Sequence, residues 1–154
     1  MLIIILMAAG LVVGTVAIHA VGIDALLRTI VRSRALDVLG FRRVTPFVFG
    51  LTCWLILIHL AEISIWGLFY FWQGCLPDVE SAFYFSGVTY TTVGYGDIVL
   101  SKEWRLLAPV EALTGILMVG LSTGLFFALV SRWIRNWMQT HAASEDHPAT
   151  PISE

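Results

Sequence analysis

The chain has 154 residues, of which 58% are hydrophobic and only 13% are charged, and its formal net charge is −2. Soluble domains average about 45–50% apolar and about 25% charged residues. So few charges cannot cover a water-soluble globule, which excludes an ordinary cytosolic enzyme, a disordered protein and a nucleic-acid binder with a basic surface. Two cysteines make no disulfide framework. The composition indicates a small membrane protein.

Three apolar segments are long enough to cross a bilayer as helices, for which about 20 residues suffice. They cover residues 1–22, 46–72 and 106–133. The first lacks the basic start of a cleaved signal peptide, and its apolar run is longer, so we expect it to be retained as a helix. The remaining polar tail, 134–154, contains proline, and its part after Trp137 is expected to be disordered.

Most of the basic residues gather beside the same ends of these segments. Seven of the nine lie in the connector 23–45 or just after the third segment: Arg28, Arg32, Arg34, Arg42, Arg43, Arg132 and Arg135. By the positive-inside rule, the connector and the C-terminus are cytoplasmic, whereas the N-terminus and residues 73–105 face outside. We therefore expect a multi-pass protein of the cell membrane.

The basic connector has two interpretations. Apolar residues recur at helical spacing in its first part (Ile23, Leu26, Leu27, Ile30 and Val31). This predicts a short amphipathic helix that lies on the cytoplasmic leaflet and ends near Gly40. A solvated basic loop that only fixes the topology is the alternative.

Residues 73–105 are too interrupted by glycine and polar residues to form a spanning helix. A short re-entrant helix is predicted over 79–90, after Pro77 and Asp78. The motif that follows contains two glycines, which enter positive-φ conformations at little cost. If the backbone conformation alternated between left-handed and right-handed along the motif, successive carbonyl groups would point to one side. Several copies of the motif around an axis would then form stacked rings of carbonyl oxygens, which could bind a dehydrated monovalent cation. The motif consists of Thr91, Thr92, Val93, Gly94, Tyr95, Gly96 and Asp97.

At these residues the sequence resembles the potassium-channel pore family, whose filter signature TVGYG matches residues 92–96 letter for letter. The resemblance covers residues 46–133. It implies an all-α membrane fold, in which three spanning helices (the first one additional) are joined by a re-entrant pore helix and a selectivity filter. It also implies a homotetramer with one central pore, in which the backbone oxygens of Thr92, Val93, Gly94 and Tyr95 bind K⁺.

The function implied by this resemblance is passive conduction of K⁺, without covalent chemistry and without a cofactor. The chain would then be no enzyme, and its partners would be its own copies, K⁺ and membrane lipid, with no nucleic acid. A non-conducting scaffold or regulatory subunit that retains the pore fold is the alternative. The complete filter motif argues against that alternative.

Three residues are expected to support the filter. In some relatives, a carboxylate on the pore helix hydrogen-bonds the aspartate that follows the filter, but Val88 occupies that position here. Tyr84 stands where relatives place a Trp or Tyr, which predicts a Tyr84–Asp97 hydrogen bond; packing of Tyr84 between helices is the alternative. Glu111, deep in an apolar run, needs a partner, and we expect it to hydrogen-bond the back of the pore helix or filter, in preference to sensing protons.

Five residues of the third segment are candidates for a gate. Gly115 lies where relatives often have a hinge, although close helix packing is the alternative. Gly120 and Gly124 form a small-xxx-small pattern that favours packing, with a second hinge as the alternative. Phe126 and Phe127 would form a hydrophobic constriction, unless one of them faces lipid.

The other ionisable residues in apolar runs are histidines and one glutamate. His59 and Glu62 are three residues apart and share a helix face, where either proton sensing or a structural role is open. His19 is expected at the cytoplasmic interface. Cys53 and Cys75 are too far apart to pair within one chain, and we expect Cys75 to be a free thiol rather than an intersubunit disulfide.

Overall fold

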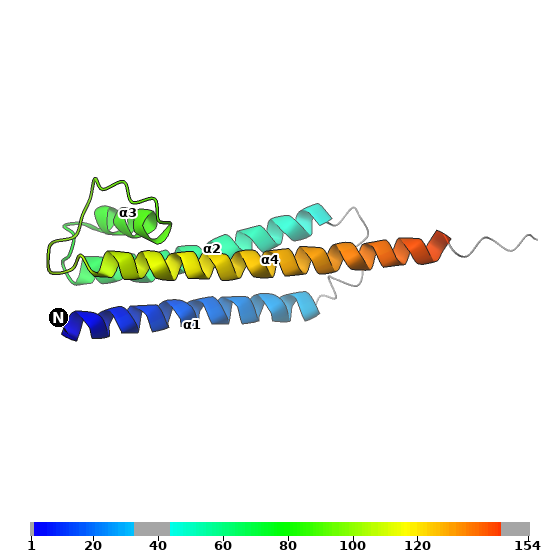
Figure 1. The fold of residues 1–154 in the computed structure, drawn as a ribbon, viewed down its shortest axis with the longest axis horizontal. Coiled ribbons are helices and arrows are strands. Elements are labelled where there is room, and N and C mark those ends of the chain that lie inside the picture. Colours follow the sequence, from blue (N-terminus) through cyan, green and yellow to red (C-terminus); the bar gives the residue numbers. More distant parts are fainter. Residues whose placement is uncertain (1, 33–43, 146–154) are drawn as a thin grey trace, which may run out of the picture.

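The computed structural model describes residues 2–32 and 44–145, and this part of the chain contains four helices and no strand. They are α1 (Leu2–Arg32), α2 (Val44–Trp72), α3 (Val79–Tyr90) and α4 (Leu107–Glu145). Figure 1 shows α1, α2 and α4 side by side along the long axis, with the short α3 beside one end of α2 and α4. The predicted all-α architecture is confirmed.

Three of the helices are long and apolar enough to cross a membrane. The candidate spans are Leu2–Arg32, Thr45–Trp72 and Leu107–Gln139. By contrast, α3 has 12 residues, which at 1.5 Å per residue give only about 18 Å of helix. The architecture therefore combines three spanning helices with one short helix that enters from one end.

The first helix is longer than predicted. It continues through Ile23 to Arg32, so the interpretation of this stretch as a separate helix on the leaflet is wrong. The cause is tertiary packing, because Leu26 and Ile30 are buried in a cluster with residues of α2 and α4 rather than facing lipid headgroups. The rest of the connector, 33–43, which holds Arg34, Gly40, Arg42 and Arg43, lies outside the described residues.

The last helix also extends beyond its predicted end. α4 continues past Trp133 to Glu145, so the expectation of a disordered chain after Trp137 is wrong for residues 138–145. Residues 134–145 contain no glycine or proline, and Met, Gln, Ala and Glu are good helix formers. The first breaker is Pro148, within the stretch 146–154 that lies outside the described residues.

Side chains of α2 attach α1 to the rest of the molecule at two levels. Trp66 donates its indole N–H to Thr15 Oγ1 at 2.9 Å, and both side chains are completely buried. Trp54 donates in the same way to the carbonyl oxygen of Gly22 at 3.0 Å. These bonds and the apolar contacts around them fix α1 against α2 on the side opposite to α3 (Figure 1).

The start of α3 is capped by Asp78. Its Oδ1 accepts a hydrogen bond from the Ser81 backbone N–H at 2.8 Å, and its Oδ2 accepts one from the Ser81 hydroxyl at 2.9 Å. The cap satisfies an amide that has no partner within the helix. The bond from the Ser81 amide is the main cause that lowers the pKa of the Asp78 carboxyl group.

We expect the stabilising effect of this cap to depend on pH. Because the pKa of Asp78 is lowered in the folded protein, its contribution is complete above the usual aspartate pKa of about 3.9 and is lost as the pH falls through the lowered value. Asp78→Asn keeps a capping oxygen without the charge. Tryptophan fluorescence in detergent measures the unfolding temperatures of wild type and Asp78→Asn. The difference between them should shrink as the pH falls below the usual aspartate pKa of about 3.9. A pH-independent difference would contradict this assignment.

Candidate functional site

The segment after α3 has an alternating backbone. The φ angles are positive at every second residue, with 62° at Thr92, 52° at Gly94 and 78° at Gly96. Gly94 and Gly96 thus adopt the conformation predicted from the sequence. Thr92 was not predicted to do so, and among the described residues it is the only non-glycine residue with a positive φ. The structure thus has the alternation of backbone handedness that the sequence led us to expect along this motif.

Hydrogen bonds to the last turn of α3 hold this backbone in place. Thr92 donates its amide to Thr89 O at 2.9 Å, and Gly94 donates its amide to Val88 O at 3.0 Å. A β-branched residue in the left-handed region costs about 1–3 kcal/mol and persists only where its surroundings impose it. These bonds also satisfy carbonyl groups that a helix end leaves free. Val88 therefore supports the segment through its backbone oxygen.

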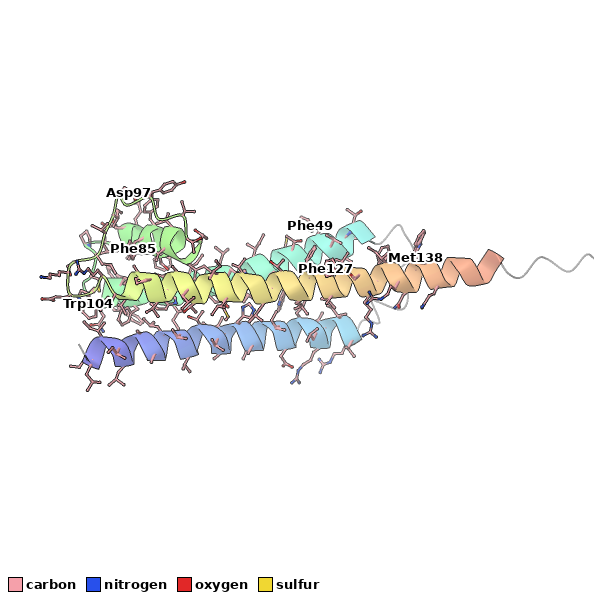
Figure 2. The ribbon with its side chains drawn as sticks, viewed as in Figure 1. Phe49, Phe85, Asp97, Trp104, Phe127 and Met138 are labelled. Carbon is pink, nitrogen blue, oxygen red and sulfur yellow. The ribbon has the colours of Figure 1, made fainter. Side chains whose placement is uncertain are left out.

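The outer end of the segment is fastened by Asp97. Tyr84 donates its hydroxyl to Asp97 Oδ2 at 2.7 Å, so the predicted hydrogen bond is present. The second carboxylate oxygen accepts the Ile98 amide at 3.0 Å. The bond with Tyr84 lowers the pKa of Asp97, and the same bond raises the pKa of Tyr84. Figure 2 shows Asp97 on the loop that arches over α3, away from α1.

The buried carboxyl group of Glu111 joins α4 to both α2 and α3. It has no exposed surface. The Ser86 hydroxyl of α3 donates to Oε1 at 2.6 Å, and the Tyr70 hydroxyl of α2 donates to Oε2 at 2.7 Å. The expectation that Glu111 hydrogen-bonds the pore helix is confirmed, whereas Tyr70 was not predicted as a partner.

Removal of this carboxyl group should be strongly destabilising. Glu111→Ala leaves two buried hydroxyl groups without an acceptor, each costing about 1–3 kcal/mol, and also leaves a cavity. Glu111→Gln keeps the volume and one acceptor oxygen, so it should lose about half as much. Chemical denaturation in detergent, followed by tryptophan fluorescence, measures both. A Glu111→Gln variant as stable as the wild type, beside a destabilised Glu111→Ala, would show that the second hydrogen bond contributes little.

A second buried carboxyl group, Glu62, lies at the junction of three helices. His19 Nδ1 is 2.8 Å from Oε1, and His59 Nδ1 is 3.1 Å from Oε2. The hydroxyl of Tyr90, the last residue of α3, donates to the same Oε2. His59 and Glu62, which were predicted to share a helix face, are thus in contact, and Glu62 has two further partners that the sequence did not predict.

The interfacial position predicted for His19 is wrong. Its side chain is buried, and because α1 runs to Arg32, His19 lies about 20 Å before the end of that helix. The signal that identifies it is its place in an apolar run, where an ionisable group is costly unless it has a partner.

The candidate gate residues divide into packed and open positions. A Cβ at Gly115 would overlap the carbonyl oxygen of Tyr90, so this glycine permits close packing of α4 on α3. Phe126 is partly buried against the cluster formed by α1, α2 and α4, and its role in a constriction stays a prediction. Phe127 is 73% exposed. A Cβ added at Gly120 or Gly124 would have no atom within 4 Å, so the packing predicted there is not made within the described chain.

Both cysteines, Cys53 and Cys75, are free in the described chain. Burial raises the pKa of the Cys75 thiol, which makes it less reactive at neutral pH.

Comparison with known proteins gives one result. Residues 56–132, half of the chain, match the model of a family described as ion channels. The match includes most of α2, all of α3, the segment 91–97 and α4 as far as Arg132. No curated protein and no solved structure matches the chain. The extent of the family match, on a chain with three helices able to cross a membrane, shows that this multi-pass protein belongs to the ion channel family.

Proposed function

We propose that the protein is a potassium-selective channel subunit, which conducts K⁺ passively through the central pore of a homotetramer. The observation that carries this proposal is the alternation of φ at Thr92, Gly94 and Gly96 within the TVGYG motif. Such a backbone directs the carbonyl oxygens of Thr92, Val93, Gly94 and Tyr95 to one side, where they replace the hydration shell of the ion. Conduction of this kind requires neither a cofactor nor covalent chemistry.

The exposure of the segment supports an assembly of several copies. The side chains of Val93 and Tyr95 are 50% and 72% exposed in a single chain. One strand of carbonyl groups also leaves most of an ion's surroundings empty, so several copies must meet around an axis. The resemblance to potassium channels, whose filters are built from four such loops, supports an assembly of four. In this tetramer Phe127, which is exposed in a single chain, is the better candidate of the two phenylalanines for a constriction. Gly120 and Gly124 lie on surfaces that other copies or the pore can use.

The distribution of arginine supports an orientation with the filter outside. Arg28 and Arg32 lie in the last turns of α1, and Arg132 and Arg135 lie in the second half of α4. Figure 1 has the N-terminus at the same end of the molecule as α3, far from these arginines. By the positive-inside rule, the N-terminus and the filter would therefore face outside, and the C-terminus would face the cytoplasm.

Cation flux into proteoliposomes tests the proposal. The purified protein should admit K⁺ much faster than Na⁺, and Ba²⁺ should block the flux. Chemical cross-linking in detergent should yield a ladder that ends at four chains. A protein that passes neither ion at any pH or voltage, although cross-linked as a tetramer, would instead be the non-conducting scaffold. Equal fluxes of both ions would retain an ion channel but overturn potassium selectivity.

A further inference from the structure

Two histidines and one glutamate converge between α1 and α2, apart from the filter. One potential ligand atom from each of His19, His59 and Glu62 lies within 4.8 Å of the other two. His19 comes from α1, and the other two come from successive turns of α2. Imidazole nitrogen and carboxylate oxygen are the donors with which proteins bind zinc and related divalent transition metals.

The carboxyl group of this cluster has no lysine or arginine on its own helix and lies far from the arginines of α1. Glu62 is completely buried, and residues 44–90 contain no lysine or arginine. The nearest basic residue of α1 is Arg28, nine residues beyond His19, or about 13 Å along the helix. A carboxylate at such depth is costly without a positive partner. The imidazoles of His19 and His59 carry a positive charge only when protonated, whereas a bound divalent ion would offset the carboxylate charge in either case.

One of the two ring nitrogens of His19 has no hydrogen-bond partner among the described residues. Its Nδ1 approaches Glu62, whereas its Nε2 is buried and has no hydrogen-bond partner among the described residues. Buried polar atoms without partners are uncommon in native proteins. Hydrogen bonding among the described residues therefore accounts for only one nitrogen of the His19 ring.

We propose that His19, His59 and Glu62 form a binding site for a divalent transition-metal ion of the zinc class. Their nitrogen–oxygen distances are 2.8 and 3.1 Å. Ligands around a tetrahedral zinc ion, each about 2.0–2.1 Å from the metal, stand about 3.3 Å apart. Binding therefore requires small outward movements, and any proton on a ligating nitrogen must be lost or moved to the other ring nitrogen. The site does not depend on the proposed potassium conduction.

The position of the site gives the ion a structural consequence. Tyr90, whose hydroxyl donates to Glu62 and lies 3.0 Å from His59 Nδ1, directly precedes the filter segment. It can orient the carboxylate or take the fourth ligand position. An ion here would therefore fasten α1 to α2 beside the inner end of the pore helix. The His59 side chain is 18% exposed, which gives an approach to the site.

Metal binding to the full chain in detergent tests the proposal. The protein is purified without a histidine tag, and the other two histidines are removed as His141→Ala and His147→Ala. We expect about one Zn²⁺ per chain by elemental analysis, and visible d–d bands of tetrahedral type when Co²⁺ is the probe. Glu62→Gln and His19→Asn in this background should weaken binding at least tenfold. Glu80→Gln, which alters an exposed carboxyl group outside this cluster, should leave binding unchanged.

The Co²⁺ spectrum of the chain with all three ligands intact decides the question even if a ligand variant fails to fold. Absence of the d–d bands together with no bound Zn²⁺ would overturn the proposal. Binding that persists undiminished in a folded Glu62→Gln variant would also overturn it. A thiolate-to-cobalt charge-transfer band would place the ion on Cys53 or Cys75 instead and would equally exclude the proposed site.

Discussion

Replacing Gly94 with alanine is expected to abolish selective K⁺ flux while leaving the helices in place. No atom lies within 4 Å of a Cβ at this position in the chain, so the obstacle is the backbone, whose φ is +52°. An L-residue in the left-handed region costs about 1–2 kcal/mol. If the backbone of residue 94 relaxed to a negative φ, the adjacent carbonyl group would rotate away from the side proposed to face the ion. The alternation of φ with Thr92 and Gly96 would also be lost. K⁺ and Na⁺ uptake into proteoliposomes measures the loss.

Gly10→Ala is the matched control for this experiment. Gly10 lies within α1 and likewise has no atom within 4 Å of a Cβ, but it has an ordinary helical backbone. Alanine there should favour the helix by as much as about 1 kcal/mol and should leave flux unchanged. If Gly94→Ala retained both the flux and the preference for K⁺, the alternating backbone would not be what selects the ion, and the proposed filter would be wrong.

The bounds of α2 and α3 were largely predictable, because local signals set them. The predicted helix 79–90 and α3 have the same bounds, since Asp78 caps the start and the glycine-containing motif ends the helix. The predicted helix 46–72 and α2 differ by two residues at one end. Pro46 near the first turn and the polar residues after Trp72 are signals that act within a few residues.

The parts that were not predictable depend on contacts between distant segments. The continuation of α1 to Arg32 rests on burial of Leu26 and Ile30 against α2 and α4. His19 finds Glu62 at a sequence separation of 43 residues, and Tyr70 finds Glu111 at 41. The hydrophobic pattern of one helix cannot identify such partners. The positive φ of Thr92 was equally hidden, because hydrogen bonds to α3 impose it on a residue type that avoids it.

Replacing Gly115 with alanine is expected to destabilise the protein and to displace the end of α3. The added Cβ would overlap Tyr90 O and would lie 3.0 Å from Tyr90 C and 3.1 Å from Tyr90 Cγ. Overpacking of this kind costs about 1–3 kcal/mol, and the upper end is expected because the opposing atom belongs to the backbone. Tyr90 precedes the filter segment directly, so the loss of K⁺ selectivity should accompany the loss of stability. Chemical denaturation and ion flux measure the two effects on the same preparation.

The same experiment separates packing from a hinge at Gly115. A hinge glycine faces no close neighbour, so its replacement by alanine would change the fraction of open channels while stability stayed the same or rose. Gly50→Ala in α2, where no atom lies within 4 Å of a Cβ, controls for the general effect of adding a methyl group to a spanning helix. If Gly115→Ala altered the flux but left the stability unchanged, Gly115 would be a hinge after all. A parallel loss of both assigns this glycine to the contact that holds the pore helix against α4.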